Sequence, residues 1–68
     1  MSGGMVRIGD TFGVAAHPYI RWTVIGIHDD SGAAANVVLR SAADPQVERV
    51  VALPVLQNPA RFIRVAGA

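Results

Sequence analysis

The stretch from Ile20 to His28 constrains the fold of this chain more than any other. It holds the single tryptophan and is dominated by β-branched residues, which favour a pleated strand. Strict alternation places Trp22 and Val24 on one face, and the pattern breaks at Gly26. Because a glycine inside a strand is typical of a bulge, we predict that Trp22, Val24 and Ile27 point into the core and that Gly26 forms a corner. The alternative is a flat strand whose second face is covered by a second subunit.

The N-terminal part of the chain predicts a first strand. Its apolar residues share one parity, which indicates a strand with one face in water. These residues are Val6, Ile8, Phe12 and Val14. Gly9 and Asp10 interrupt the pattern and predict a kink near which the strand begins. Residues 15–19 are expected to form a connecting loop, because Pro18 has no N–H to donate and biases His17 toward extended geometry.

Two further strands and two turns are expected after the long strand. Residues 29–32, Asp-Asp-Ser-Gly, have the side chains and the glycine that turns require. Residues 36–41 then form a strand, residues 42–46 a second turn, and residues 47–53 the strand that pairs back.

Neither of these two strands alternates cleanly. Val38 and Val50 fall on the face opposite to the other apolar residues, which are Val37, Leu39, Val51 and Leu53. Strands that are apolar on both sides are usually buried on both faces. In so short a chain, we expect a second copy to cover the outward face.

The C-terminal part is expected to close the sheet. Residues 54–59 contain two prolines and predict a single 3₁₀ turn, with Leu56 plugging the end of the fold. Residues 61–65 form a last short strand, and residues 66–68 fray. The chain therefore predicts an all-β fold, a small five-stranded barrel with one helical turn before the last strand.

Size and composition add a prediction about assembly. The chain has 68 residues and no cysteine, so neither disulfides nor thiolate metal sites stabilise it. It is 51% hydrophobic and 16% charged, with a mean hydropathy of +0.37. A domain of this size buries only about 60% of its unfolded surface. We therefore expect a homo-oligomer, most simply a dimer, or a protein partner.

The sequence also carries expectations about boundaries and location. Residues 1–4 are interpreted as a leader outside the fold, with one domain over residues 5–66. No apolar run approaches the ~20 residues that span a bilayer, and the N-terminus has no secretory pattern, so a cytoplasmic protein with no membrane contact is expected.

The order of these elements resembles that of the SH3-like barrel. The resemblance rests on residues 6–10 at the start, residues 22–27 on the long strand, and residues 50–56 running into the turn before Phe62. It covers most of the chain and concerns topology rather than the motif of one family. The acidic loop with which eukaryotic SH3 domains bind proline-rich peptides is absent. The resemblance implies a scaffold used for protein contacts, nucleic-acid contacts and small subunits of larger assemblies.

Catalytic and metal-binding patterns are weak. His28, Asp29 and Asp30 stand together, but a metal site needs further ligands and His17 is the other histidine. Ser31 or Ser41 with a histidine and an aspartate is the sole combination for nucleophilic catalysis, and no Gly-x-Ser-x-Gly elbow is present. We therefore expect no enzyme activity, no metal and no cofactor.

Binding is the remaining class of function, and we expect a non-catalytic interaction module that self-associates or belongs to a larger assembly. All six basic residues are arginines, which suit phosphate and carboxylate better than lysine does. The alternative is a nucleic-acid-associated accessory protein, in which Arg21 beside Trp22, and Arg61 and Arg64 beside Phe62, contact phosphates while the aromatic rings stack on bases. The candidate binding residues are Tyr19, Arg21, Val38, Arg40, Val50, Arg61 and Arg64.

Overall fold

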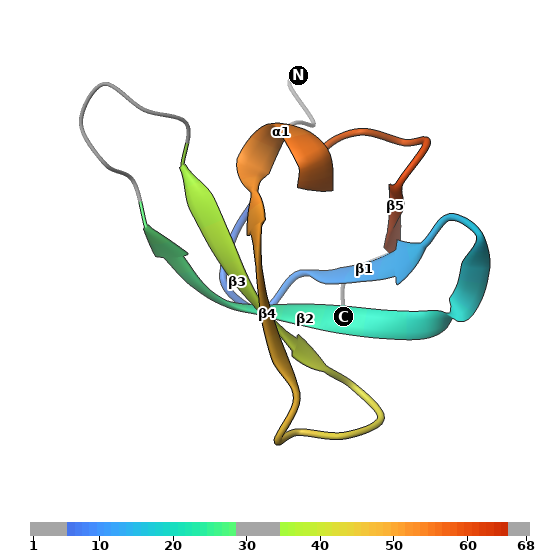
Figure 1. Ribbon diagram of the computed structural model, residues 1–68, viewed down its shortest axis with the longest axis horizontal. Coiled ribbons are helices and arrows are strands. Elements are labelled where there is room, and N and C mark those ends of the chain that lie inside the picture. Colours follow the sequence, from blue (N-terminus) through green and yellow to red (C-terminus); the bar gives the residue numbers. More distant parts are fainter. Residues whose placement is uncertain (1–5, 29–34, 66–68) are drawn as a thin grey trace.

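The computed structural model describes residues 6–28 and 35–65, and in this part the chain is all-β. Five strands form one antiparallel sheet in the order β4-β3-β2-β1-β5, and one helical turn separates β4 from β5 (Figure 1). The elements are β1 (Thr11–Val14), β2 (His17–His28), β3 (Asn36–Ser41), β4 (Glu48–Ala52), α1 (Leu53–Leu56) and β5 (Phe62–Val65). The predicted leader, the turn at residues 29–32 and the fraying residues 66–68 lie outside the described residues.

The sheet is curled but does not close, which corrects the prediction of a closed barrel. β4 and β5 are its two edges, and no ladder of hydrogen bonds joins them within the described residues. The chain passes from β4 to β5 through α1 and a turn instead of a tight hairpin, so the two strands are held apart. Figure 1 shows α1 between the end of β4 and the start of β5.

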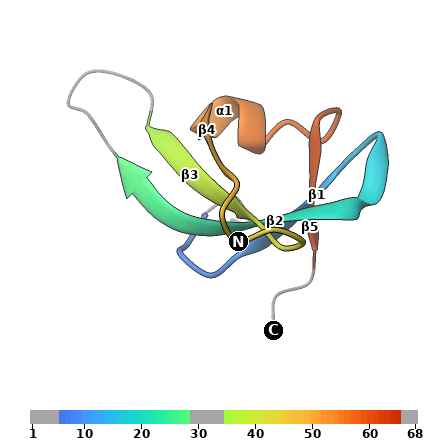
Figure 2. The ribbon, with the colours of Figure 1, turned by 60° about the horizontal axis from the view of Figure 1, so that its bottom comes forward.

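β2 is longer than predicted and begins inside the expected loop. Ala15 and Ala16 make a two-residue turn, and His17 already pairs with Val14. The next pair is Arg21 with Gly13, so the three residues between, 18–20, have no partner on β1. Proline is tolerated at such an irregular position because no ladder bond needs its N–H. The long curved course of β2 is clearest in Figure 2.

A tight turn precedes β1, at the position of the predicted kink. The Asp10 N–H donates to the Arg7 carbonyl at 3.1 Å, and Gly9 between them has a φ of 99°. Positive φ at the third residue is the signature of a type II turn, which favours glycine. The turn leaves Ile8 67% exposed, although the alternation placed it on the buried face. It also shortens β1 to residues 11–14.

The predicted bulge in β2 is confirmed. Val24 pairs with Leu39, and the next partner along β3, Val38, pairs with Gly26, so Ile25 is the extra residue. The shift brings Ile27 opposite the buried Val37, which is the change of face that the sequence predicted. Ile27 itself is 38% exposed, because it lies near the end of the strand, and it is not part of the core.

The core lies on one side of the sheet, here called the inner face. Its fully buried members are Val24, Val37, Leu39 and Leu56. Phe12, Val51 and Phe62 complete the buried cluster, and Trp22 packs against it while only partly buried. The inner face of β3 and β4 thus carries Val37, Leu39 and Val51 as the sequence predicted, whereas Leu53, expected at the end of the strand, begins α1 and packs partly buried against the core.

The helical turn before β5 is confirmed, but it is mainly α-helical. The Gln57 N–H donates to the Leu53 carbonyl, four residues back, and the Asn58 N–H donates to the Val55 carbonyl, three residues back. A single turn with both bond types is common where a helix ends. Leu56 is buried at the end of the fold as predicted. Within the described residues, no helix has the length and apolarity to cross a membrane.

Candidate functional site

The outer face of the sheet brings four of the seven candidate binding residues onto one surface. Residues opposite each other on neighbouring strands share a face. Val50 pairs with Val38, and Val38 pairs with Gly26, which forms one row. Glu48, Arg40 and Thr23 form the next row, and Arg21 follows two residues before Thr23 on β2. Arg21, Val38, Arg40 and Val50 therefore lie on the outer face.

Val38 and Val50 form an apolar pair on this face. Val50 is 62% exposed and Val38 is partly buried beneath it. A Cβ on Gly26 would lie 3.6 Å from the Val38 Cβ, so the glycine is on the same side but covers nothing. The face that the sequence expected a partner to cover is therefore left open by the residues that the structure describes.

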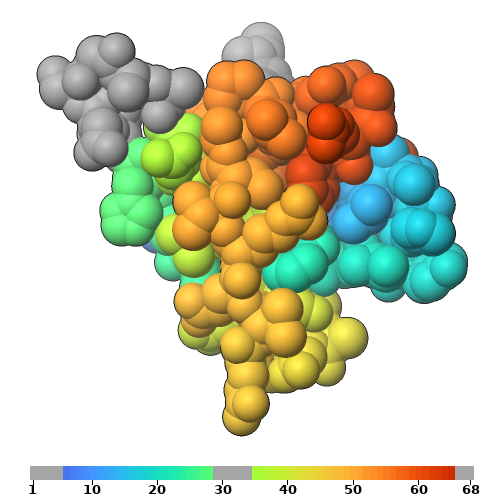
Figure 3. All heavy atoms as spheres, viewed as in Figure 1, coloured from blue at the N-terminus to red at the C-terminus, as the bar shows by residue number. Residues whose placement is uncertain are grey.

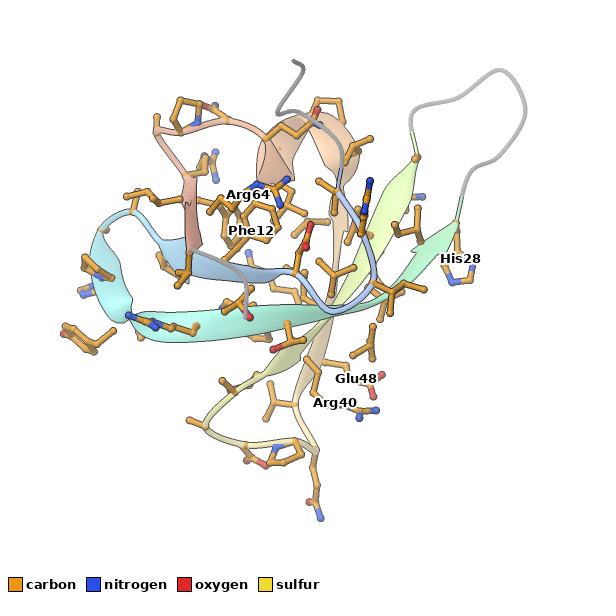
Figure 4. All side chains as sticks on the ribbon, turned by 180° about the vertical axis from the view of Figure 1, so that it is seen from behind. Phe12, His28, Arg40, Glu48 and Arg64 are labelled. Carbon is orange, nitrogen blue, oxygen red and sulfur yellow. The ribbon has the colours of Figure 1, made fainter. Side chains whose placement is uncertain are left out.

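Arg40 is engaged in an ion pair and is not a free cation. Its Nη2 donates to Glu48 Oε2 at 3.0 Å, and the two side chains are 45% and 48% exposed (Figure 4). Exposed pairs of this kind contribute between zero and about 1 kcal/mol, because water screens them. The pair does make the end of the outer face next to the valines electrically neutral.

Arg64 lies on the inner face and holds β5 against the N-terminal turn. Its Nη1 donates to Asp10 Oδ2 at 2.7 Å, and its guanidinium lies 5.1 Å from the centre of the Phe12 ring (Figure 4). The backbone N–H of Arg7 donates to the same carboxylate oxygen at 2.9 Å. This backbone hydrogen bond, and then the Arg64 guanidinium, hold the pKa of Asp10 below its ordinary value.

Two hollows of about 420 Å³ each lie on the surface of the described part of the chain. One is apolar and runs beside β5, between Phe12, Leu56, Pro59 and Phe62, with Arg64 at its border. The other combines Tyr19, Ile20 and Arg21 of β2 with residues 41–43. The structure thus brings together two candidates, Tyr19 and Arg21, at the point where β2 extends beyond β3.

Tyr19 is the most exposed aromatic residue among those described. It is 79% exposed and meets the His17 ring edge-on, with 6.0 Å between the ring centres. Arg61 lies in the turn before β5, with an exposed side chain and a backbone carbonyl that accepts from the Ala15 N–H. The structure does not join Arg61 to the valine pair on β3 and β4.

The aromatic rings assigned to base stacking are largely used by the core. Phe62 is 7% exposed, and Trp22 packs against the buried cluster with its Nε1 buried and without a hydrogen-bond partner. Single-stranded nucleic acids stack on exposed aromatic rings, whereas the Phe62 ring is buried and the Trp22 ring is partly used in packing. The arginines beside them are exposed, so the nucleic-acid alternative depends on the arginines alone.

The histidines considered from the sequence for metal binding or catalysis lie far apart along β2. His17 and His28 are the first and last residues of β2, and Figure 4 labels His28 at one end of the strand. No group of three His, Asp or Glu side chains meets in the described part of the chain. Ser41 Oγ accepts from the N–H groups of Ala43 and Asp44 at 3.2 Å, which makes it a turn former. Asp29, Asp30 and Ser31 lie outside the described residues.

The feature that sequence reasoning missed is the side of β4 that pairs with no strand among the described residues. β4 pairs with β3 on one side only. Two hydrogen bonds at the ends of this ladder show which β4 residues bond to β3: the Ser41 N–H donates to the Val47 carbonyl, and the Leu53 N–H donates to the Ala35 carbonyl. Backbone groups in an antiparallel strand point alternately to the two sides. Those of Glu48, Val50 and Ala52 therefore point away from β3. Exposed valines were the available signal, but only the topology identifies the edge.

Comparison of the chain with protein-family models, with curated proteins and with solved structures gives no match.

Proposed function

We propose that this protein is a non-catalytic interaction module that associates with itself. The observation that carries the proposal is the Val38–Val50 pair on the outer face, immediately beside the unpaired edge of β4. An apolar pair at a free edge is a surface that natural proteins normally cover or interrupt with charge. Here the charges in the next row of the outer face, Arg40 and Glu48, neutralise each other, and Arg49, beside Val50 on β4, belongs to the opposite face of the sheet.

The distribution of exposed apolar residues supports the same proposal. Among the described residues, eight large hydrophobic side chains are exposed, and single ones are normal on any protein. Three of the eight, Val47, Val50 and Val55, come from β4 and its immediate neighbours. Figure 3 shows this segment, in orange, running down the front of the molecule. Val50 lies on the outer face and Val47 on the opposite face, so apolar side chains are exposed on both faces of the sheet at this edge.

The succession of elements supports an SH3-like scaffold for this module. A long bulged second strand, two antiparallel partners and one helical turn before a short last strand resemble the order in SH3-like barrels. Folds of this kind serve many functions, so the function is argued from the surface and not from the fold.

Molar mass measured by sedimentation at low and high salt tests the proposal. Association through an apolar surface should persist or strengthen as salt rises. Binding to nucleic acid through arginine–phosphate contacts should weaken steeply instead. Titration of Trp22 fluorescence with single-stranded and duplex DNA, at the same two salt concentrations, provides the comparison. A chain that stays monomeric but binds DNA at low salt only would contradict the proposal and support the alternative.

A further inference from the structure

We infer that two copies of this chain associate through their β4 edges, antiparallel and about a two-fold axis at Val50, so that the two sheets become one. This inference rests on the proposed function and specifies the surface that performs it. The partner is a second copy of the same chain.

The backbone of β4 limits the possible pairings. Only residues whose N–H and C=O point outward can form the new ladder, and these are Glu48, Val50 and Ala52. A two-fold axis at Val50 pairs it with Val50 of the second copy and pairs Glu48 with Ala52. This register uses all three outward residues, with two hydrogen bonds per pair and about six in total.

The two neighbouring registers form fewer hydrogen bonds, and one of them also places like charges opposite each other. Shifting the strands so that Arg49 faces Arg49 uses only two outward pairs and places like charges opposite each other. Shifting them so that Val51 faces Val51 also leaves one outward pair unmade. Pairing cannot continue past Ala52, because α1 begins at Leu53 and Pro54 has no N–H. The register centred on Val50 is therefore preferred on both hydrogen bonding and charge.

The side chains agree with this register. On the outer face, the Val38–Val50 row of one copy continues into the Val50–Val38 row of the other, which gives four valines in line. On the inner face, Arg49 of one copy comes beside Val51 of the other, and Val47, 44% exposed in the single chain, lies just beyond the end of the new ladder. Glu48 stays with Arg40 of its own chain and meets no second acid.

The interface is small. Stable dimers bury roughly 1,200–2,000 Å² in total, and two five-residue strands contribute only part of this area. We therefore expect a dimer that dissociates on dilution. Because the two-fold axis pairs the β4 edge of one copy with the same edge of the other, neither β4 edge stays available for a third copy, and the assembly stops at two copies.

Two variants test the inference on the full chain. Val50→Pro removes an N–H that points away from β3, a position where edge strands tolerate proline. Val50→Cys adds the only thiol of the chain, at a pair whose Cα atoms would be ~5.5 Å apart, within the range that a disulfide bridges. Ile63→Cys is the matched control, because Ile63 is 48% exposed on β5, the opposite edge.

Sedimentation of the parent chain should give twice the 7.1 kDa chain mass at high concentration, and Val50→Pro should give the chain mass with an unchanged β-sheet circular-dichroism spectrum. Under mild oxidation, Val50→Cys should form covalent dimer about tenfold or more faster than Ile63→Cys, because pairing raises the local thiol concentration.

Four outcomes would overturn the inference. Equal cross-linking of the two cysteine variants, or a dimer that survives Val50→Pro, would place the interface elsewhere and leave the proposed function standing. Masses at multiples above two would indicate pairing of unlike edges. A parent chain that is monomeric at every concentration would remove the proposed self-association as well.

Discussion

Truncation of Trp22 tests how the core ends at the rim of the sheet. Removing a fully buried tryptophan costs about 3–5 kcal/mol. Trp22 is only partly buried, which reduces the lost burial to roughly 2–4 kcal/mol. Its Nε1 is buried without a hydrogen-bond partner, and removing such a group returns about 1 kcal/mol. We therefore expect Trp22→Ala to lower the free energy of unfolding by about 2 kcal/mol.

Urea denaturation followed by circular dichroism measures this change, since the variant lacks the fluorophore. For a domain of this size, 2 kcal/mol corresponds to a fall in Tm of roughly 8–16 °C. Trp22→Phe is the matched control, because it keeps a ring against the core and removes the unpaired N–H. Its stability should stay within about 1 kcal/mol of the parent. If Trp22→Phe costs as much as Trp22→Ala, the indole N–H has a partner and the reasoning is wrong.

Four further substitutions probe the turn, the bulge, the helical turn α1 and the ion pair. Gly9→Ala should destabilise the fold by about 1–2 kcal/mol, because φ at this position is 99°. Gly26→Ala should be tolerated, because its Cβ would meet the Val38 Cβ at an ordinary 3.6 Å. Equal melting temperatures for the two variants would refute this prediction. Leu56→Ala should lower the free energy of unfolding in urea by about 2–5 kcal/mol, more than Trp22→Ala, because Leu56 is fully buried. A smaller loss would mean that α1 does not cover the end of the core. Because the pKa of Asp10 is lowered in the folded state, its carboxylate contributes stability above pH ~4 that is lost as the pH falls through the folded-state pKa. Asp10→Asn should therefore flatten the decline in Tm between about pH 5 and pH 2. An unchanged dependence of Tm on pH would contradict this prediction.

The bulge in β2 and the two faces of β3 and β4 were predictable, because they follow from local patterns. Gly26 interrupts an otherwise alternating strand, and a change of register is the usual result. Val38 and Val50 stand out from Val37 and Val51 by parity alone. In each case the residue and its immediate neighbours contain the information.

The exposure of Ile8 and Ile27 was not predictable in the same way. Alternation gives the face of a strand, but it does not say whether that face extends as far as the residue concerned. Ile8 falls in the turn before β1, and Ile27 lies near the far end of β2. Similarly, Pro18 suggested a loop over residues 15–19, but the turn takes only Ala15 and Ala16, and β2 already begins at His17.

The candidate site divided for a topological reason. From the sequence alone, Arg40 and Arg64 are equivalent candidate cations. In the folded chain, Arg64 forms an ion pair with Asp10 on the inner face, and Arg40 forms one with Glu48 on the outer face. Partners 54 and 8 residues away cannot be inferred from local pattern. The unpaired side of β4 depends on the same information, because an edge is defined by the strand that is missing beside it.

Amide hydrogen exchange of β4 tests the central claim most directly. In a single chain, the N–H groups of Arg49 and Val51 are bonded to β3 and protected, while those of Glu48, Val50 and Ala52 point outward and exchange fast. Pairing of two β4 strands predicts that Val50 becomes protected to a degree similar to Val51 in concentrated samples and loses that protection on dilution. Rapid exchange at Val50 at every concentration would contradict the account.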